Sequence, residues 1–471
     1  MENYIFQWSE GESLVLFNCW AKCFCELSKY IGKDTDMFGV VETRNVTTFI
    51  TKQNAEVSAE FSKRFLEAEF QKEFLLKIDS AKTDFDSLFS ELRATKLHSL
   101  SNEQLAVFLE KFESCIINTA VPFAMMQAEF TDYPHKIIKE AMKKTGGSAV
   151  EEDLSILLMP DEMDVIKREE LAFSKLGKNP SQEALLAHCY EYAVLFYNSY
   201  NELQNIDFLR SRLSRIKPFS ELKKEFEAEQ KHRKALQLKL EAKLNADTKR
   251  AVQFLRTLGL QRLELKDKWA GAEFRFLSLF KEVSKRMSIG LNDVFSVYSI
   301  PELIAFLRNE PRVEETKLRQ RKQFYTVTVK AGKVSIVEGE EAKVLVQKHL
   351  PEYFVRNDVR EIRGGVANPG KVTAKAYVVK VVGIAELSNA IKEFEQGAVL
   401  VTTMTQPNMV PLMRKASAVV TDEGGMTSHA AVLSREFGVP CIVGTHIATK
   451  AIKTRDLIEV DANNGIIRKI E

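Results

Sequence analysis

Glycine is distributed unevenly along this chain, and the distribution limits how each part can fold. Of 21 glycines, ten lie between Gly364 and Gly465, a stretch that makes up less than a quarter of the 471 residues. Glycine is unfavourable inside helices and is favoured where the chain turns tightly. The sequence therefore predicts a turn-rich C-terminal fold that is preceded by a mainly helical region.

Apolar residues recur with a helical period across most of the first 310 residues. The clearest stretches are residues 54–78, 105–117, 183–203, 222–258 and 271–287. Spacings of three and four residues place apolar side chains on one face of a helix, which packs against a core. Residues 222–244 are strongly charged and lack persistent heptads, so we expect an exposed helix or a helical hairpin there.

A short β-hairpin is predicted between the helical region and the glycine-rich one. Residues 324–329 and 333–337 are rich in β-branched side chains and flank Ala331-Gly332, a hairpin pattern. The charged stretch that follows, up to Arg363, suits a solvated tether. The predicted class is α+β, with an all-helical domain at residues 1–310, a connector at 311–360 and a β/α domain at 361–471.

Composition and charge indicate a globular cytoplasmic protein. A formal net charge of +2 gives no electrostatic footprint for nucleic acid or for an anionic membrane. No apolar run approaches the roughly 18 residues that a membrane helix needs, and the first residues lack a signal-peptide pattern. The six cysteines have no framework spacing. Cys19 and Cys23 are expected on a buried helix face and not at a metal site.

Residues 421–432 carry the strongest chemical signal in the chain. His429 follows the paired glycines Gly424 and Gly425 at what is predicted to be the start of a helix. A helix start offers unpaired backbone N–H groups and the positive end of the helix dipole, which favour a phosphate. The glycines allow the backbone to approach an anion closely. A neutral imidazole at such a place can attack a phosphoryl group and hold it as a phosphoramidate.

The hydroxyl and acidic residues around His429 have two interpretations each. Thr427 is the expected N-cap of the helix, and Thr427 and Ser428 are also placed to donate hydrogen bonds to phosphate oxygens. Asp422 is expected to orient the loop or the imidazole, although turn formation explains it equally well. On these residues alone, a helix-capping loop that happens to contain a histidine stays open as the alternative.

Five segments in order resemble one known domain. They are residues 364–370 (GGVANPG), 404–407 (MTQP), 421–432 (TDEGGMTSHAAV), 437–444 (FGVPCIVG) and 457–461 (LIEVD). Together they resemble the swivelling phosphohistidine, or mobile, domain of phosphoenolpyruvate-utilising enzymes, which include phosphoenolpyruvate synthase, pyruvate phosphate dikinase and rifampicin phosphotransferase. The resemblance implies that His429 is the phosphorylated residue. From their chemistry, Gly424, Gly425, Thr427 and Ser428 are the expected phosphate-binding residues.

The resemblance also implies a transferase of the kinase type that works with a second protein. Nothing in the chain resembles the ATP-grasp domain that phosphorylates this histidine in the dikinases, so we expect an ATP-grasp-type partner to supply the donor site in trans. Magnesium, with ATP or phosphoenolpyruvate, is expected at that partner site, and no cofactor is expected to bind this chain firmly. The alternative is a non-catalytic regulatory or docking subunit of such a system.

The helical region is expected to bind the small molecule that accepts the phosphoryl group. Segments near residues 157–171 and 276–303 resemble, more weakly, the helices that precede the phosphohistidine domain in phosphoenolpyruvate-synthase-like proteins. His188 and Tyr192 share a helix face and are the candidate acceptor-binding residues. A packed core histidine among tyrosines is the competing interpretation. Residues 42–45 are a weaker polar candidate that is expected to form a surface loop.

Overall fold

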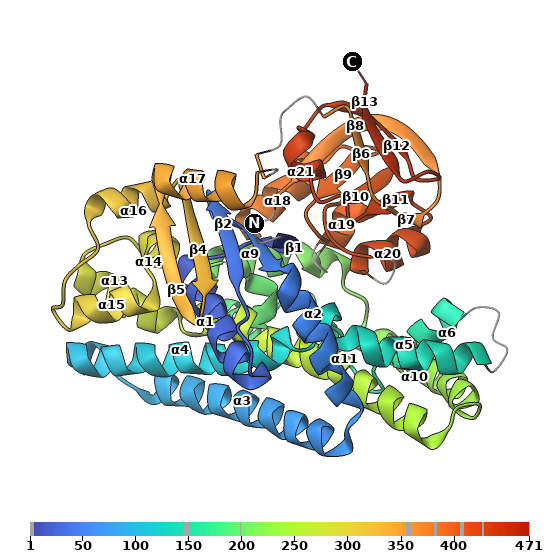
Figure 1. The fold of residues 1–471 in the computed structure, drawn as a ribbon, viewed down its shortest axis with the longest axis horizontal. Coiled ribbons are helices and arrows are strands. Elements are labelled where there is room, and N and C mark those ends of the chain that lie inside the picture. The colour runs from blue at the N-terminus through green and yellow to red at the C-terminus, as the bar shows by residue number, and fades with distance from the viewer. Residues whose placement is uncertain are drawn as a thin grey trace.

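The first sheet is formed by strands that lie on both sides of the helical region in the sequence. The computed structural model describes residues 4–144, 150–197, 199–351, 353–354, 359–380, 384–405, 409–425 and 428–470. This sheet has five antiparallel strands in the order β1-β3-β2-β4-β5 (Figure 1). Its strands are β1 (Tyr4–Gly11), β2 (Met37–Glu42), β3 (Asn45–Thr51), β4 (Phe324–Lys330) and β5 (Lys333–Glu338).

Most of the chain between β3 and β4 is helical. The helices up to β4 are α1 (Leu14–Ile31), α2 (Lys52–Phe61), α3 (Ala68–Ala94), α4 (Asn102–Ala124), α5 (Ala128–Lys144), α6 (Val150–Leu158), α7 (Val165–Lys175), α8 (Gln182–Glu191), α9 (Glu202–Arg212), α10 (Phe219–Glu241), α11 (Ala246–Ala270), α12 (Ala272–Arg275), α13 (Leu277–Met287), α14 (Leu291–Val297), α15 (Ile300–Leu307) and α16 (Glu315–Arg321). The charged stretch at residues 222–244 lies mostly in α10, whose buried residues are Leu222 and Gln237, so the expected exposed helix forms there.

Helix α1 joins the first sheet to the helical layer. It packs against β4 on one side and α4 on the other. Its apolar face is fully buried and includes Cys19 and Cys23, as the sequence predicts. The ring of Phe17 lies directly over Gly39 of β2, where a Cβ atom would come within 2.2 Å of the Phe17 Cζ atom. A side chain at position 39 would therefore push α1 away from the sheet.

The other face of the first sheet is covered by α17 (Gly339–His349). Phe38 and Val40 of β2 form a small buried cluster with Val346 of α17 and with Tyr353, which follows the helix. Figure 1 shows α17 lying across one end of the sheet, close to the C-terminal part of the chain. This cluster fixes the segment that leads into the second sheet.

The C-terminal part of the chain forms an eight-stranded sheet in the order β6-β13-β12-β8-β9-β10-β11-β7 (Figure 1, upper right). Its strands are β6 (Glu361–Arg363), β7 (Gly365–Asn368), β8 (Lys371–Val379), β9 (Val399–Thr402), β10 (Ala418–Thr421), β11 (Cys441–Val443), β12 (Leu457–Asp461) and β13 (Ile466–Lys469), and its helices are α18 (Ile384–Glu393), α19 (Val410–Met413), α20 (His429–Phe437) and α21 (Ala448–Ala451).

Strands β8, β9, β10 and β11 are parallel and form the centre of this sheet. Of these, β9, β10 and β11 are short, fully buried strands that consist mainly of apolar residues, as is usual for parallel strands covered by helices. The two outermost strands, β6 and β7, are consecutive in the sequence with only Gly364 between them. The sheet therefore curves round until its two edges are neighbours.

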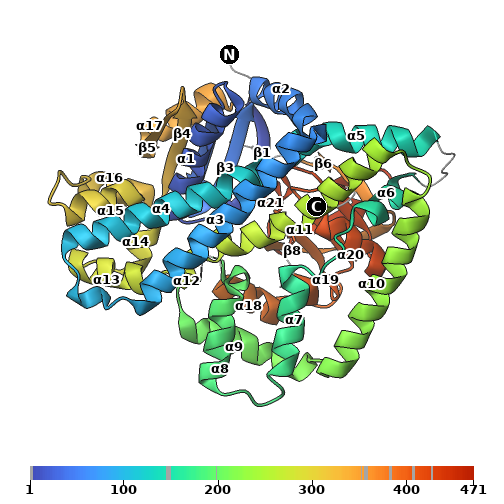
Figure 2. The same cartoon turned by 90° about the horizontal axis from the view of Figure 1, so that it is seen from below.

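The C-terminal domain rests on the helical region through α18, which packs against α9. Leu387 of α18 and Phe208 of α9 belong to one buried apolar cluster. Figure 2 shows α18 beside α9 when the molecule is seen from below. A second contact joins Lys450 of α21 to Tyr353, with the Lys450 Nζ atom 3.5 Å from the centre of the ring.

The predicted α+β class, the large helical N-terminal region and the C-terminal β/α region are confirmed. The description of the first 310 residues as all-helical is wrong in detail, because β1, β2 and β3 lie within them. The hairpin at Ala331-Gly332 forms as expected, but β4 pairs with β2, so the hairpin is part of a sheet and not a free connector. The domain limits stay a prediction.

No helix within the described part of the chain is both long enough and apolar enough to cross a membrane.

Candidate active site

The loops that follow β9, β10 and β11 meet at the carboxyl ends of these three parallel strands of the second sheet. Because β9, β10 and β11 run in the same direction, the loops at their carboxyl ends are adjacent, which is the usual position of a ligand site in such sheets. Backbone hydrogen bonds join these loops. The Asp422 N–H donates to the Thr402 carbonyl at 3.1 Å, and the Thr445 N–H donates to the Thr421 carbonyl at 3.1 Å. The loop that leads to His429 is thus attached to both neighbouring strands.

Asp422 connects the loop after β10 to the loop after β11. Its buried carboxylate accepts a hydrogen bond from the Thr445 hydroxyl at 2.7 Å and another from the Thr449 hydroxyl. The Thr449 backbone N–H, in the first turn of α21, also donates to the carboxylate at 3.2 Å. Asp422 therefore orients the loop, which is one of the two predicted roles. Among the described residues, the hydrogen bonds to its carboxylate come from the loop after β11 and from α21.

Gly424 gives the loop a conformation that other residues rarely adopt. Its φ is +99°, and a Cβ atom there would lie 2.8 Å from the Ser428 side chain. Gly424 and Gly425 are both exposed, so their backbone is accessible to a ligand. The Ser428 N–H donates to the Gly425 carbonyl at 3.0 Å and closes the turn. The paired glycines thus give the sharply turned backbone that the sequence predicts, and this backbone is accessible to a ligand.

Helix α20 begins at His429, so the candidate histidine occupies the first helical position. Ser428 is the N-cap: its extended backbone precedes the helix, and its hydroxyl accepts a hydrogen bond from the Ala431 N–H at 3.3 Å. The prediction of Thr427 as the N-cap is therefore wrong. Thr427 itself and the side chain of His429 lie outside the part of the chain that the structure describes, so their contacts with a phosphate stay a prediction.

The position of His429 has clear electrostatic consequences. The first N–H groups of a helix lack partners within the helix and carry partial positive charge. A phosphoryl group bound near His429 would meet this end of α20 and the exposed backbone of Gly424 and Gly425. The arrangement can hold an anion through backbone groups, without needing a cationic side chain.

Lys450 of α21 is close enough to Asp422 for their charges to interact. Burial lowers the pKa of its ammonium group to about 8, and the charges of Asp422 and Glu42 oppose that shift. Glu42 is at the end of β2, so the charge of Lys450 interacts both with the loop that contains Asp422 and with the first sheet. Thr445, Thr449 and Lys450 were not predicted from the sequence. Their position directly after the short buried strand β11 is the signal that would have found them.

His188 and Tyr192 lie side by side, as their spacing predicts, with ring centres 4.8 Å apart. His188 is buried, and its Nε2 atom is 2.9 Å from the Glu169 carboxylate. Arg212 donates two hydrogen bonds to the same carboxylate, at 2.8 and 2.9 Å. Burial raises the pKa of Glu169, but the hydrogen bonds from His188 and Arg212 outweigh burial, so the pKa is lowered overall. This is the environment of a packed core histidine, and a role in acceptor binding stays a prediction.

Residues 42–45 form the tight turn between β2 and β3, with positive φ at Thr43 and Arg44. The prediction of a surface loop is only partly correct, because the Arg44 side chain points inward. It donates a hydrogen bond to the Tyr200 hydroxyl at 3.2 Å. Beside them the carboxyl of Glu273 is fully buried and accepts a hydrogen bond from the Ser13 hydroxyl. Burial raises the pKa of Glu273 to about 7, although Ser13, Arg44 and Tyr200 oppose the rise.

Within the described residues, no group of three or more histidine, cysteine, aspartate or glutamate side chains is arranged to hold a metal ion.

The C-terminal part of the chain, which contains His429, is similar to known proteins. Residues 394–465 match the family model described as PEP-utilising enzyme, mobile domain. The chain is 42% identical over 140 residues to the phosphoenolpyruvate synthase of Pyrococcus furiosus, covering 29% of this chain and 16% of that protein. It is 44% identical over 130 residues to the phosphoenolpyruvate synthase of Aeropyrum pernix, covering 28% of this chain and 15% of that protein.

A longer match, 42% identical over 176 residues, is to a probable phosphoenolpyruvate synthase of Staphylothermus marinus and covers 37% of this chain and 17% of that protein. The chain thus spans about a sixth of the length of these curated relatives. Among solved structures, holo aconitase X of Thermococcus kodakaraensis matches 24% of this chain and 98% of its own at 14% identity. Its TM-score of 0.18 supports no structural conclusion.

Proposed function

Because the C-terminal region carries a PEP-utilising enzyme mobile domain, we propose that this protein transfers a phosphoryl group through a phosphohistidine at His429. The observation that carries the proposal is the position of His429 as the first residue of α20, next to the exposed backbone of Gly424 and Gly425. Asp422 supports it by holding the loop against the neighbouring strands. Phosphoryl transfer depends mainly on such positioning and on charge stabilisation.

The reaction consists of two displacements. In the first, an imidazole nitrogen of His429 attacks the phosphorus atom of the donor, so that a P–N bond forms and the P–O bond to the leaving group breaks. In the second, an oxygen of the acceptor attacks the same phosphorus, the P–N bond breaks and the imidazole becomes neutral again. The imidazole must be neutral to attack, which an unperturbed histidine mostly is near pH 7.

The donor site belongs to a second protein in this proposal. An ATP-grasp-type partner would bind ATP and magnesium, with phosphoenolpyruvate as the alternative donor. The acceptor is a small molecule held by the helical region. The contact between α18 and α9 supports this assignment, because it keeps the C-terminal domain against that region.

A labelling experiment tests the proposal. The full chain is incubated with labelled ATP or labelled phosphoenolpyruvate, with and without cell extract, and label that is stable to base but labile to acid is measured. We expect such label on the wild type when extract is present, and none on His429→Ala. His232→Ala, which removes an exposed histidine of α10, is the matched control and should keep the label.

The absence of label under every condition, from a protein that is folded by circular dichroism, would refute the phosphotransfer proposal. It would favour the alternative of a regulatory or docking subunit. Label that persists in His429→Ala would show that another residue is modified and would equally refute the role of His429.

A further inference from the structure

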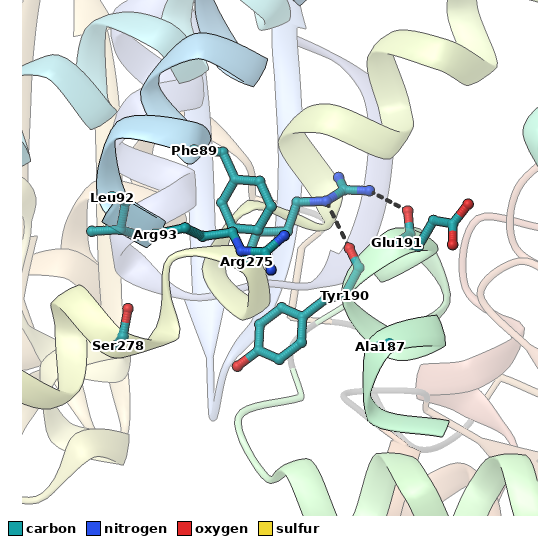
Figure 3. Close-up of a pocket in the computed structure, with 8 residues that line it drawn as sticks. All are labelled: Phe89, Leu92, Arg93, Ala187, Tyr190, Glu191, Arg275 and Ser278. Atoms are coloured by element: carbon teal, nitrogen blue, oxygen red, sulfur yellow. Dashed lines mark hydrogen bonds between the residues drawn. The ribbon is translucent and has the colours of Figure 1, made fainter. Parts of the chain in front are cut away.

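A cavity of about 590 Å³ lies in the helical region, away from His429's loop. It is lined by Phe89, Leu92, Arg93, Ala187, Tyr190, Glu191, Arg275 and Ser278. These residues come from the end of α3, from α8, and from α12 and α13 (Figure 3). Its volume is in the range of about 300–1,000 Å³ that is usual for small-molecule sites.

Tyr190 provides a rigid wall of the cavity. Its ring is stacked on the ring of Phe274, with centroids 4.7 Å apart, and its hydroxyl donates to the Glu202 carboxylate at 2.8 Å. Glu202 is held in turn by Lys281 at 2.7 Å. The ring therefore presents a fixed, flat apolar surface to the cavity, beside the apolar side chains of α3.

Arg275 has a structural role at the inner side of the cavity. It is buried, and its charge is neutralised by the Asp267 carboxylate at 2.8 Å. It also donates to the backbone carbonyls of Tyr190 and Glu191, at 3.1 and 2.8 Å. Figure 3 shows these two bonds, which attach the end of α8 to α12. Arg275 thus shapes the wall and has little capacity left for a ligand.

Arg93 is the second cationic side chain that lines the cavity, and it remains available to a ligand. Its guanidinium is exposed and lies 5.9 Å from the centre of the Phe89 ring, and within the described chain it has no recorded hydrogen bond or ion pair. Burial and the Glu202 carboxylate raise the pKa of Tyr190, and the nearby charge of Arg93 opposes this rise. In Figure 3 Arg93 lies above the Tyr190 ring, whereas the Glu191 carboxylate is turned away from both.

The surface that continues from the cavity is also basic. A neighbouring hollow of about 550 Å³ shares Leu92, Arg93 and Ser278 with it and adds Lys96, Lys281 and Lys285, with Glu282 as its acidic residue. Glu282 is paired with Arg286 at 2.9 Å. In the described chain, Lys96 and Lys285 have no recorded ion pair. An anion would therefore be attracted to the mouth of the cavity from this side.

We propose that this cavity binds a small organic anion whose acidic group, a carboxylate or a phosphate, pairs with Arg93 while its flat apolar body packs against Tyr190 and Phe89. Arginine is suited to both groups because its planar N–H groups match two acidic oxygens. That this anion is the phosphoryl acceptor rests on the proposed function; the binding site itself does not. The cavity is suitably placed for that role, because α8 packs against α9, which carries the C-terminal domain.

Binding of simple probes tests the site directly. Benzoate, phenyl phosphate and neutral benzamide are titrated into the full chain, and binding is followed by ligand-observed NMR. We expect benzoate or phenyl phosphate to bind more tightly than benzamide, and the comparison of the two anions identifies the preferred acidic group. Arg93→Ala should weaken anion binding about tenfold, the loss of one charge-assisted contact.

Two further variants separate a binding contact from a general effect of charge. Arg312→Ala is the matched control, because Arg312 also stacks on a phenylalanine, with its guanidinium carbon 4.1 Å from the centre of the Phe306 ring, but lies outside the cavity. It should bind the anions as the wild type does. Ala187→Trp, at an exposed position on the cavity wall, should block binding by filling the space.

The inference is overturned if neither anion binds the wild type, if benzamide binds equally well, or if Arg93→Ala binds the anions unchanged. His429→Ala should keep full anion binding. If His429 fails to become phosphorylated while Arg93-dependent binding holds, only the acceptor role is lost. If His429 is phosphorylated but no anion binds, the proposed function stands and this site is rejected.

Discussion

The buried carboxyl of Glu273 makes the stability of this protein depend on pH in a way that one substitution should remove. Glu273 lies in α12, fully buried, among Ser13, Arg44 and Tyr200. Its pKa is about 7 in the folded protein, against 4.5 for an ordinary glutamate. A carboxyl whose pKa is raised by folding stabilises the fold fully below the unfolded pKa, and this contribution is lost as the pH rises through the folded value.

The magnitude follows from the two pKa values. At about 1.4 kcal/mol per pH unit, the interval between 4.5 and about 7 corresponds to about 3 kcal/mol of unfolding free energy. Most of that loss should occur between pH 5 and pH 8. Glu273→Gln keeps the shape and an oxygen that can accept the Ser13 hydrogen bond, but it cannot ionise. We therefore expect the variant to gain stability relative to the wild type as the pH rises.

Urea unfolding at pH 5, 6, 7 and 8, followed by circular dichroism, measures the effect. The difference in unfolding free energy between Glu273→Gln and the wild type should shift by about 2–3 kcal/mol in favour of the variant from pH 5 to pH 8. Glu310→Gln, which removes an exposed carboxylate, is the control and should show no such trend. A difference for Glu273→Gln that stays constant within about 1 kcal/mol over this interval would refute the reasoning, because it would mean that Glu273 ionises normally inside the fold.

Three other substitutions test the packing and capping described above. Arg212→Ala should lower the unfolding free energy by about 3 kcal/mol in urea titrations, because it leaves the buried Glu169 carboxylate without its main counter-charge. Ser428→Ala should cost about 1 kcal/mol, seen as faster amide hydrogen exchange in the first turn of α20, because the helix loses its cap. Gly39→Ala should lower stability by about 1–3 kcal/mol, measured as a reduced Tm, because the new methyl group collides with the Phe17 ring.

Each of these three has a matched control. Arg210→Ala removes an exposed ion pair and should change stability by less than about 1 kcal/mol. Ser181→Ala removes the cap of α8 and should leave hydrogen exchange in α20 unchanged. Gly290→Ala places a methyl group in open space and should leave the Tm nearly constant. A control variant that changed the unfolding free energy, the hydrogen exchange or the Tm as much as the variant it is paired with would show that the assigned contact does not cause the effect.

The start of α20 shows how far local sequence can locate a site. The paired glycines before His429 indicated a turn followed by a helix, and the helix does begin at His429. The cap was assigned one residue too early, because threonine and serine at positions 427 and 428 are both good caps. The hydrogen bond from the Ala431 N–H to the Ser428 hydroxyl decides between them.

The missed elements have two physical causes, which are an unusual turn and partners that are distant in the sequence. The turn between β2 and β3 contains no glycine, since Thr43 and Arg44 adopt the positive φ themselves, so the usual hairpin signal is absent. Strand β2 then pairs with β4, almost 300 residues later. Sequence spacing similarly placed His188 and Tyr192 on one face but did not indicate Glu169, which determines the environment of His188.

The short outer strands of the second sheet also affect how this protein avoids aggregation. An unpaired strand edge can recruit a strand from another molecule, and proteins limit this risk with short or charged edge strands. Strands β6 and β7 have three and four residues, and charged Glu361 and Arg363 flank the buried Ile362 in β6. The edge strand β1 of the first sheet, by contrast, has eight residues. A C-terminal domain that separates from α9 would thus expose little edge for mispairing, so self-association would be expected to begin at the first sheet.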